Sequence, residues 1–243
     1  MSLIGIIASS KSTGAQPHLT DLRMWYDAND NTTLTVSGSP SRVSAITSKA
    51  SGYTHTLSQG TSAKQPEVVA NYQNGLQALK LTNARGDDLR IGNASPMNGA
   101  TAHTTFVACK TNSTTNGYKF CFGNDTSYEF PLFYQLSSKN YYETSTGTSA
   151  VTSTSNFNGV ANVMMIKHTG TSVTMITSTA TDETNTATGG GSLSVGNTIT
   201  AIGRDPGGGT ADVHIFEILV YTGILDATAT AKTKDYLKTK WGI

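Results

Sequence analysis

The sequence predicts an all-β sandwich of two antiparallel sheets with a short C-terminal helix, and three observations favour it. Short apolar strands recur through most of the 243 residues, between turns rich in Gly, Asn, Ser and Thr. The strand over residues 213–221 is apolar on both faces, as in the central strand of a covered sheet. After it, Asp226 is a candidate N-cap for a helix. The apolar stripe expected for that helix consists of Ala229, Tyr236, Leu237 and Trp241.

The strand over residues 213–221 also predicts which side chains share a face. Side chains alternate along a strand with a period of two. One face is therefore expected to carry Phe216, Ile218 and Val220. The other face is expected to carry Val213, Ile215, Leu219 and Tyr221, with Glu217 among them.

The remaining strands are expected at the spacing of a sandwich. In chain order they cover residues 22–26, 34–36, 42–46, 54–57, 66–69, 78–81, 88–91, 104–110, 118–121, 130–136, 141–143, 161–168, 172–177 and 198–202. A short Gly-containing hairpin is predicted across Thr169-Gly170-Thr171. The polar stretch over residues 178–192 is predicted to be the longest loop.

Composition limits the classes of partner. Charged residues make up 14% of the chain and the formal net charge is +1, so the electrostatic footprint of nucleic-acid or anionic-membrane binding is missing. No apolar run approaches the ~18 residues of a membrane span. We therefore expect neither a nucleic-acid nor a membrane partner. Cys109 and Cys121 lie on neighbouring predicted strands, and two buried thiols are favoured over a cross-strand disulfide.

Both ends of the chain carry recognisable motifs. The opening runs Leu22-Arg23-Met24-Trp25-Tyr26-Asp27-Ala28-Asn29-Asp30. The closing strand contains Glu217-Ile218-Leu219-Val220-Tyr221, and the helix ends with Tyr236-Leu237 followed by Lys240-Trp241-Gly242. Together, over about residues 20–92 and 211–243, they resemble the concanavalin A-like (laminin G-like) jelly-roll modules of tailed-bacteriophage structural proteins and bacterial surface proteins. The resemblance implies a jelly-roll sandwich. It does not imply one function, because this fold serves lectins, glycanases and inert spacers.

The segment before the jelly roll is expected to be a docking arm. Residues 1–18 contain an apolar set and a Gly14-Ala15-Gln16-Pro17 linker, and the jelly roll is expected to occupy residues 19–243. A signal peptide is disfavoured because the basic n-region is missing and the apolar stretch is short. The residues expected to dock on a particle are Leu3, Ile4, Ile6 and Ile7.

Catalytic patterns are not found in the sequence. Glycanases on this fold carry paired carboxylates on one strand, as in Glu-x-Asp-x-x-Glu, because two acids must flank the scissile bond. Here Asp182 and Glu183 fall in a predicted loop, while Glu217 stands alone among apolar residues. The five histidines are scattered without a nucleophile elbow. The sequence therefore predicts a protein that is not an enzyme.

Binding sites for an ion or a sugar are weighed against simpler interpretations. Asp27, Asp30 and Asp205 are weak calcium candidates, but short Asx turns explain them, so no cofactor is expected. Exposed aromatic side chains can stack on a sugar ring. The candidates for such stacking are Tyr128, Tyr134, Tyr141 and Tyr142, which would serve equally well as core or interface anchors.

These observations favour a non-enzymatic structural component of a bacteriophage virion, either a head decoration or a fibre protein. It would dock on other virion proteins through its arm, form a homo-oligomer, display the jelly roll on the virion surface and be assembled in the host bacterial cytoplasm. The alternative is a carbohydrate-binding adhesin of a phage tail fibre or bacterial surface, with a host surface glycan as partner.

Overall fold

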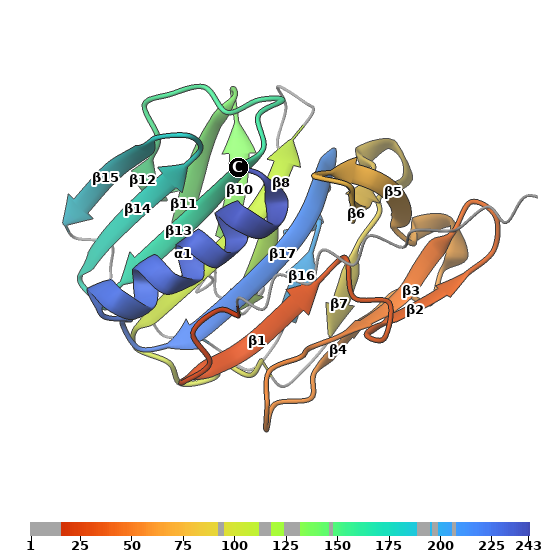
Figure 1. Cartoon of the computed structure of the whole chain (residues 1–243), viewed down its shortest axis with the longest axis horizontal. Coiled ribbons are helices and arrows are strands. Elements are labelled where there is room, and N and C mark those ends of the chain that lie inside the picture. The colour runs from red at the N-terminus through yellow and green to blue at the C-terminus, as the bar shows by residue number, and fades with distance from the viewer. Residues whose placement is uncertain are drawn as a thin grey trace, which may run out of the picture.

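The strands form two antiparallel sheets packed face to face, with the one helix on an outer face (Figure 1). The computed structural model describes residues 16–91, 95–111, 118–123, 132–145, 148–188, 195, 199–205 and 208–243. This arrangement confirms the all-β sandwich with a short C-terminal helix. Within the described residues, no helix is long and apolar enough to span a membrane.

The first sheet is built around β17. Its strand order is β15 (Asp182–Thr188), β14 (Ser172–Ser178), β13 (Asn162–His168), β8 (His103–Thr111), β17 (Val213–Thr222) and β1 (Leu22–Asp27). The second sheet has the order β12 (Thr148–Thr152), β11 (Lys139–Ser145), β10 (Leu132–Leu136), β9 (Phe120–Gly123), β16 (Ile199–Ile202) and β7 (Leu89–Ile91).

A group of early strands joins the two sheets at one edge. It comprises β2 (Leu34–Ser37), β3 (Arg42–Thr47), β4 (Thr56–Ser58), β5 (Glu67–Gln73) and β6 (Leu76–Leu81), with 3-10 turns at Ser62–Lys64 and Asn83–Arg85. β6 pairs with β17 of the first sheet, whereas β4 pairs with β7 of the second. The chain thereby closes one edge of the sandwich and leaves fewer unpaired strand edges.

Two apolar clusters hold these layers. The larger one fills the space between the sheets, with Val107, Met164 and Ile218 facing Phe122 and Phe133. The second lies between the first sheet and helix α1 (Ala227–Trp241), which crosses the outer face of that sheet (Figure 1). The first sheet is therefore covered on both faces, which explains why all of β17 except its last residue is buried.

Most of the strand predictions are confirmed, including the hairpin between β13 and β14. The prediction of a loop over residues 178–192 is wrong for residues 182–188, which form β15. This edge strand alternates between exposed and half-buried positions, but Ala187 is the one apolar residue on its half-buried face, so its period-two pattern has almost no apolar signal. Strand β12 is also absent from the sequence-based prediction.

The predicted faces of β17 are correct at its end and wrong at its start. A β-bulge between Ile215 and Glu217 places one extra residue in the strand. As a result Ile215 shares the inner cluster with Ile218, while Phe216 lies with Leu219 under the helix.

Helix α1 begins and ends as predicted. The carboxylate of Asp226 accepts a hydrogen bond from the Ala229 amide at 2.7 Å, and Gly242 ends the helix in the left-handed conformation at φ 63°. Its buried face consists of Ala229, Thr233, Tyr236, Leu237 and Trp241. The stripe expected from the sequence is therefore confirmed.

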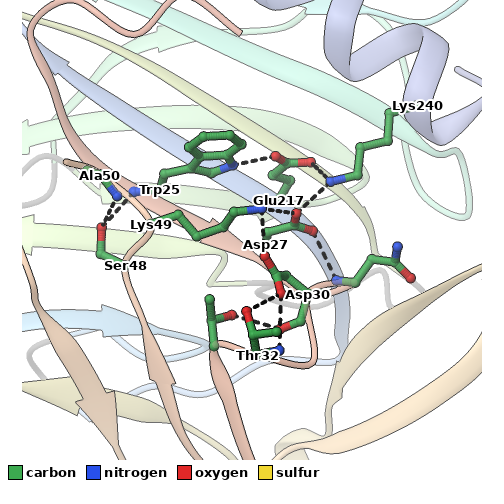
Figure 2. A network of polar contacts seen from close by, with 12 residues as sticks. Trp25, Asp27, Asp30, Thr32, Ser48, Lys49, Ala50, Glu217 and Lys240 are labelled. Atoms are coloured by element: carbon green, nitrogen blue, oxygen red, sulfur yellow. Dashed lines mark hydrogen bonds and ion pairs between the residues drawn. The ribbon is translucent and has the colours of Figure 1, made fainter. Parts of the chain in front are cut away.

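A buried carboxylate ties this helix to the sheet. Glu217 Oε1 accepts hydrogen bonds from Trp25 Nε1 at 2.6 Å and from the Tyr236 hydroxyl at 2.7 Å. Its Oε2 accepts from Lys240 Nζ at 2.7 Å and from Trp241 Nε1 at 2.9 Å. Figure 2 shows Trp25 and Lys240 reaching Glu217 from opposite sides.

The same lysine continues the network to β1. Lys240 Nζ lies 2.8 Å from Asp27 Oδ2, and Lys49 bridges that oxygen (3.0 Å) to Asp30 Oδ2 (2.8 Å; Figure 2). We call Trp25, Asp27, Lys49, Glu217, Tyr236, Lys240 and Trp241 the closing network. A carboxylate as buried as Glu217 is tolerated only when its lone pairs are satisfied, as they are here.

Of the predicted docking arm and linker, residues 1–18, the structure describes only residues 16–18. The docking residues Leu3, Ile4, Ile6 and Ile7 lie outside the described residues, so the arm stays a prediction. The backbone of His18 contacts α1 and β17 through Thr233 Oγ1 (3.2 Å) and the Tyr221 hydroxyl (2.8 Å), so the linker end packs on the sandwich. Cys109 is a buried free thiol, as favoured from the sequence.

Replacing Trp241 tests the importance of the helix. Trp241 is fully buried and stacks on Phe216 with ring centroids 5.1 Å apart. Trp241→Ala should lower the free energy of unfolding by about 3–5 kcal/mol and the Tm by about 6–20 °C. Thermal and urea unfolding would measure this, with Thr239→Ala on the exposed face of α1 as control. Equal stability of the two variants would contradict the conclusion that the buried Trp241 side chain stabilises the fold.

His214 should make stability depend on pH. It stacks on Tyr72 with ring centroids 3.9 Å apart. Burial is the main cause that lowers the pKa of His214 to about 4, helped by Lys80 and Lys110. An unfolded histidine titrates near pH 6.5, so the unfolded chain binds more protons between pH ~6.5 and ~4, and stability should fall as the pH drops through that window.

The variant His214→Phe keeps an aromatic ring beside Tyr72 and removes the titration. Its free energy of unfolding should therefore depend less on pH than that of the wild type, measured by urea titrations at pH 7 and at pH 4.5. The slope that remains belongs in part to His103, whose pKa is lowered well below its usual range by burial and by His168. Parallel pH profiles would remove His214 as a contributor.

Candidate functional site

The outer face of the second sheet carries a row of three tyrosines. Tyr134 on β10 and Tyr141 on β11 are directly paired across the sheet, and their rings stack at 5.1 Å and 17°. Tyr118, which precedes β9, places its ring 6.0 Å from that of Tyr134 on a 34° tilt. Tyr134 is 9% exposed, whereas Tyr118 and Tyr141 are half-buried. The outer two rings are therefore the ones a ligand can reach.

This row rests on a small apolar cluster separate from the two cores. Leu132 and Ala201 are buried beside Tyr134, and Ile199 packs against them. We call Tyr118, Tyr134, Tyr141, Leu132, Ile199 and Ala201 the tyrosine face. It belongs to the sheet that the helix does not cover and lies on the opposite side from the inner cluster, except that Tyr118 also packs against that cluster.

A glycine loop adjoins the tyrosine face next to Tyr118. A Cβ atom at Gly209 would lie 2.5 Å from the ring of Tyr118 and 2.9 Å from Asp205 Oδ2, so a larger residue there would require both side chains to move. Asp205 closes this loop, since its Oδ1 accepts from the Gly209 amide at 2.5 Å. Arg204 anchors the loop to the buried carboxylate of Asp88 at 3.4 Å.

A second carboxylate lies at the other end of the row. Glu143 follows Tyr141 by two residues on β11 and is paired with Leu132 on β10, so it shares their face of the sheet. The tyrosine face thus has a half-exposed tyrosine and a carboxylate at each end. This combination of flat apolar rings and flanking hydrogen-bond acceptors suits a ligand with an apolar ring face and many hydroxyl donors.

The structure separates the four tyrosines predicted for sugar binding. It places Tyr134 and Tyr141 in the same row. The prediction that Tyr142 binds a sugar is wrong. Its side chain points inward, is fully buried and forms a hydrogen bond with His103 Nε2 at 2.6 Å. Tyr128 lies outside the described residues. Sequence reasoning missed Tyr118, whose place depends on its contact with the distant Gly209.

The calcium candidates have other partners. Asp27 Oδ2 and Asp30 Oδ2 both form ion pairs with the ammonium group of Lys49. Asp27 Oδ2 also forms an ion pair with Lys240. Lysine ammonium groups therefore occupy the oxygens that a cation would need, which corrects these two candidates. Asp205 closes its own loop, as an Asx turn would. Across the part of the chain that the structure describes, no group of three or more His, Cys, Asp or Glu side chains could hold a metal ion.

Several other acidic side chains are held by cations. Asp87 pairs with Arg85, and Asp88 lies near Arg90 and Arg204. Asp182 pairs with Lys234. The buried pair Asp27 and Glu217 shares Lys240 within the closing network, so it has a structural role.

Comparison with known proteins identifies the fold. No protein-family model matches the chain, and no curated protein matches it. Among solved structures, a GH54 α-L-arabinofuranosidase is similar with a TM-score of 0.62 and 11% identity, over 93% of this chain and 60% of that one. The chain therefore spans less than two thirds of that enzyme. Trypanosoma rangeli sialidase matches with a TM-score of 0.56 and 8% identity, over 90% of this chain and 33% of the sialidase.

A third similar structure is a single domain. Domain 4 of AbnA, a GH43 extracellular arabinanase from Geobacillus stearothermophilus, was solved in complex with arabinotriose. It matches with a TM-score of 0.50 and 11% identity, over 88% of this chain and 97% of the domain. At these low identities, the TM-scores show a shared sandwich fold and nothing finer. Membership of the concanavalin A-like family stays a prediction.

The comparison overturns the expectation that the chain is not an enzyme. That expectation used the missing Glu-x-Asp-x-x-Glu pattern to exclude glycoside cleavage. The similar structures include an arabinofuranosidase and a sialidase, so enzymes that act on glycosides use this arrangement of strands. The fold and the missing motif therefore do not exclude catalysis.

Proposed function

We propose that this chain is a carbohydrate-binding protein whose ligand lies on the tyrosine face. The observation that carries the proposal is the row of three tyrosines on the uncovered sheet, with half-exposed rings at both ends. Sugar rings present one apolar face that stacks on an aromatic side chain. Their hydroxyl groups would then donate to Asp205 and Glu143 at the ends of the row.

The domain from the arabinanase supports this proposal. It has the same fold over nearly its whole length and was solved with arabinotriose. A sandwich of this size can therefore hold a short oligosaccharide. In this chain, the tyrosine row is long enough to contact more than one sugar ring, since the centroids of adjacent tyrosine rings are 5.1 Å and 6.0 Å apart.

For the biological setting, the proposal rests on the sequence alone. A phage tail fibre or bacterial surface would present such a site to a host glycan, and the N-terminal arm would supply the attachment. The virion partners, the homo-oligomer and the location on the particle all stay predictions. Deleting residues 1–15 and measuring incorporation into particles would test the arm separately from the sugar site.

Replacing Tyr141 tests the site. On a glycan array and by calorimetry with arabino-oligosaccharides, the wild type should bind at least one glycan, and Tyr141→Ala should weaken that binding by about tenfold or more. Tyr53→Ala is the matched control, because Tyr53 is a half-buried tyrosine that packs with the cluster between α1 and the first sheet. Equal losses in both variants, or no glycan bound by the wild type, would contradict the proposal.

Glycoside cleavage is the second candidate, supported by the similarity in fold to an arabinofuranosidase and a sialidase. Its test is release of nitrophenol from 4-nitrophenyl α-L-arabinofuranoside by the full chain. No release from this substrate would contradict the candidate.

A further inference from the structure

The first sheet ends in an edge strand whose backbone can accept another strand. Strand β15 is the outermost strand of that sheet, and within the described residues β14 is the one strand that pairs with it (Figure 1). About half of the backbone N–H and C=O groups of such a strand point away from its neighbour. A row of these groups is a template on which a further strand forms hydrogen bonds.

Strand β15 has none of the devices that usually prevent such pairing, which are lysine, proline and β-bulges. Its sequence contains neither lysine nor proline, and its register with β14 continues without a shift from Asp182 to Thr188. The opposite edge of the same sheet is covered at β1. There the Lys49 amide donates to the Trp25 carbonyl at 2.8 Å, and the Ser48 hydroxyl accepts from the Trp25 amide at 3.0 Å.

The second sheet has a less regular edge on the same side of the sandwich. Strand β12 pairs with β11, and the register of that pair shifts twice. Such irregularities twist an edge and interrupt its row of hydrogen-bonding groups. Of these outer strands, β15 is therefore the one best suited to pair with another chain.

The charges of β15 favour a partner strand that runs antiparallel. Its two acids lie at one end, where Asp182 pairs with Lys234 and Glu183 accepts from the backbone amides of Thr154 and Ser155. The rest of the strand is uncharged. A parallel copy of β15 would place acid beside acid, whereas an antiparallel copy places the acidic end beside an uncharged one.

We propose that β15 pairs antiparallel with β15 of a second copy of this chain, about a two-fold axis at Asn185. This register pairs all seven residues of the strand and brings no like charges opposite each other. A register centred on Glu183 would place two carboxylates opposite each other. The pairs formed across the axis are Asp182 with Thr188, Glu183 with Ala187, and Thr184 with Thr186.

The exposed face of β15 is suited to this pairing. Thr184 and Thr186 are both exposed, and the hydroxyl group of Thr186 lies 3.5 Å from that of Thr174 on β14. Pairs of threonines that face each other across strands stabilise a sheet. The second copy would extend this row of threonines across the interface.

This symmetry determines how the two copies face. A two-fold axis between antiparallel strands is perpendicular to the sheet, so the two first sheets become one continuous sheet. Both copies of α1 then lie on one side, and both tyrosine faces point to the other. Two sugar sites on one side can bind the same glycan chain, which raises avidity. That last consequence rests on the proposed function, whereas the dimer itself does not.

The test measures the association of the full chain by sedimentation velocity at low salt. The wild type should dimerise reversibly between about 1 and 100 μM, because one pair of strands makes a small interface. Combining Thr184→Lys with Thr186→Lys puts ammonium groups opposite each other at both pairs and should weaken the dimer by about tenfold or more. Combining Thr184→Lys with Thr186→Glu puts each ammonium group opposite a carboxylate and should restore association.

A matched control adds the same two charges to the edge strand at the other end of the sandwich. Thr35 and Ser37 are exposed on β2, and Thr35→Lys with Ser37→Lys should leave the dimer unchanged (Figure 1). A wild type that stays monomeric at about 100 μM would overturn the proposal. A dimer that persists in the double-lysine variant of β15 would also overturn it and would place the interface elsewhere. Calorimetry with arabino-oligosaccharides on that variant reports separately on the tyrosine face.

Discussion

The buried carboxylate of Glu217 is the constraint on which the closing of this fold depends. Removing such a group from water costs several kcal/mol, which only a full set of donors offsets. The donors come from β1 through Trp25 and from α1 through Tyr236, Lys240 and Trp241. The first strand, the last strand and the helix must therefore be in place together, since a missing donor would leave a buried charge unsatisfied.

The bulge in β17 makes this arrangement geometrically accessible. Without the extra residue at Phe216, a regular strand could not turn both Phe216 and Glu217 toward the helix. Six of the seven residues of the closing network, all except Lys49, belong to the motifs that carry the resemblance to jelly-roll modules. The resemblance is thus in part a resemblance in how the sandwich is closed. This explains why it predicts the fold well and contains no information about a ligand.

Much of the fold could be predicted because its strands have apolar faces. Strand β15 could not, since Ala187 is the one apolar residue on its half-buried face. The site was partly predictable. Tyr134 and Tyr141 were expected, and the period of two could have excluded Tyr142, because neighbours in a strand point to opposite faces. The role of Tyr118 depends on Gly209, about ninety residues away along the chain. No local pattern in the sequence encodes that contact.

The two faces of the sandwich differ in what their polar groups can still bind. On the helix side, Glu217 and Asp27 are saturated by lysine and indole donors, so this side contributes stability and has little capacity for a ligand. On the outer face of the second sheet, by contrast, the half-exposed rings of Tyr118 and Tyr141 lie at the surface. Because helix α1 covers the outer face of the first sheet, the outer face of the second sheet is the one left for a ligand, and the tyrosine face lies there.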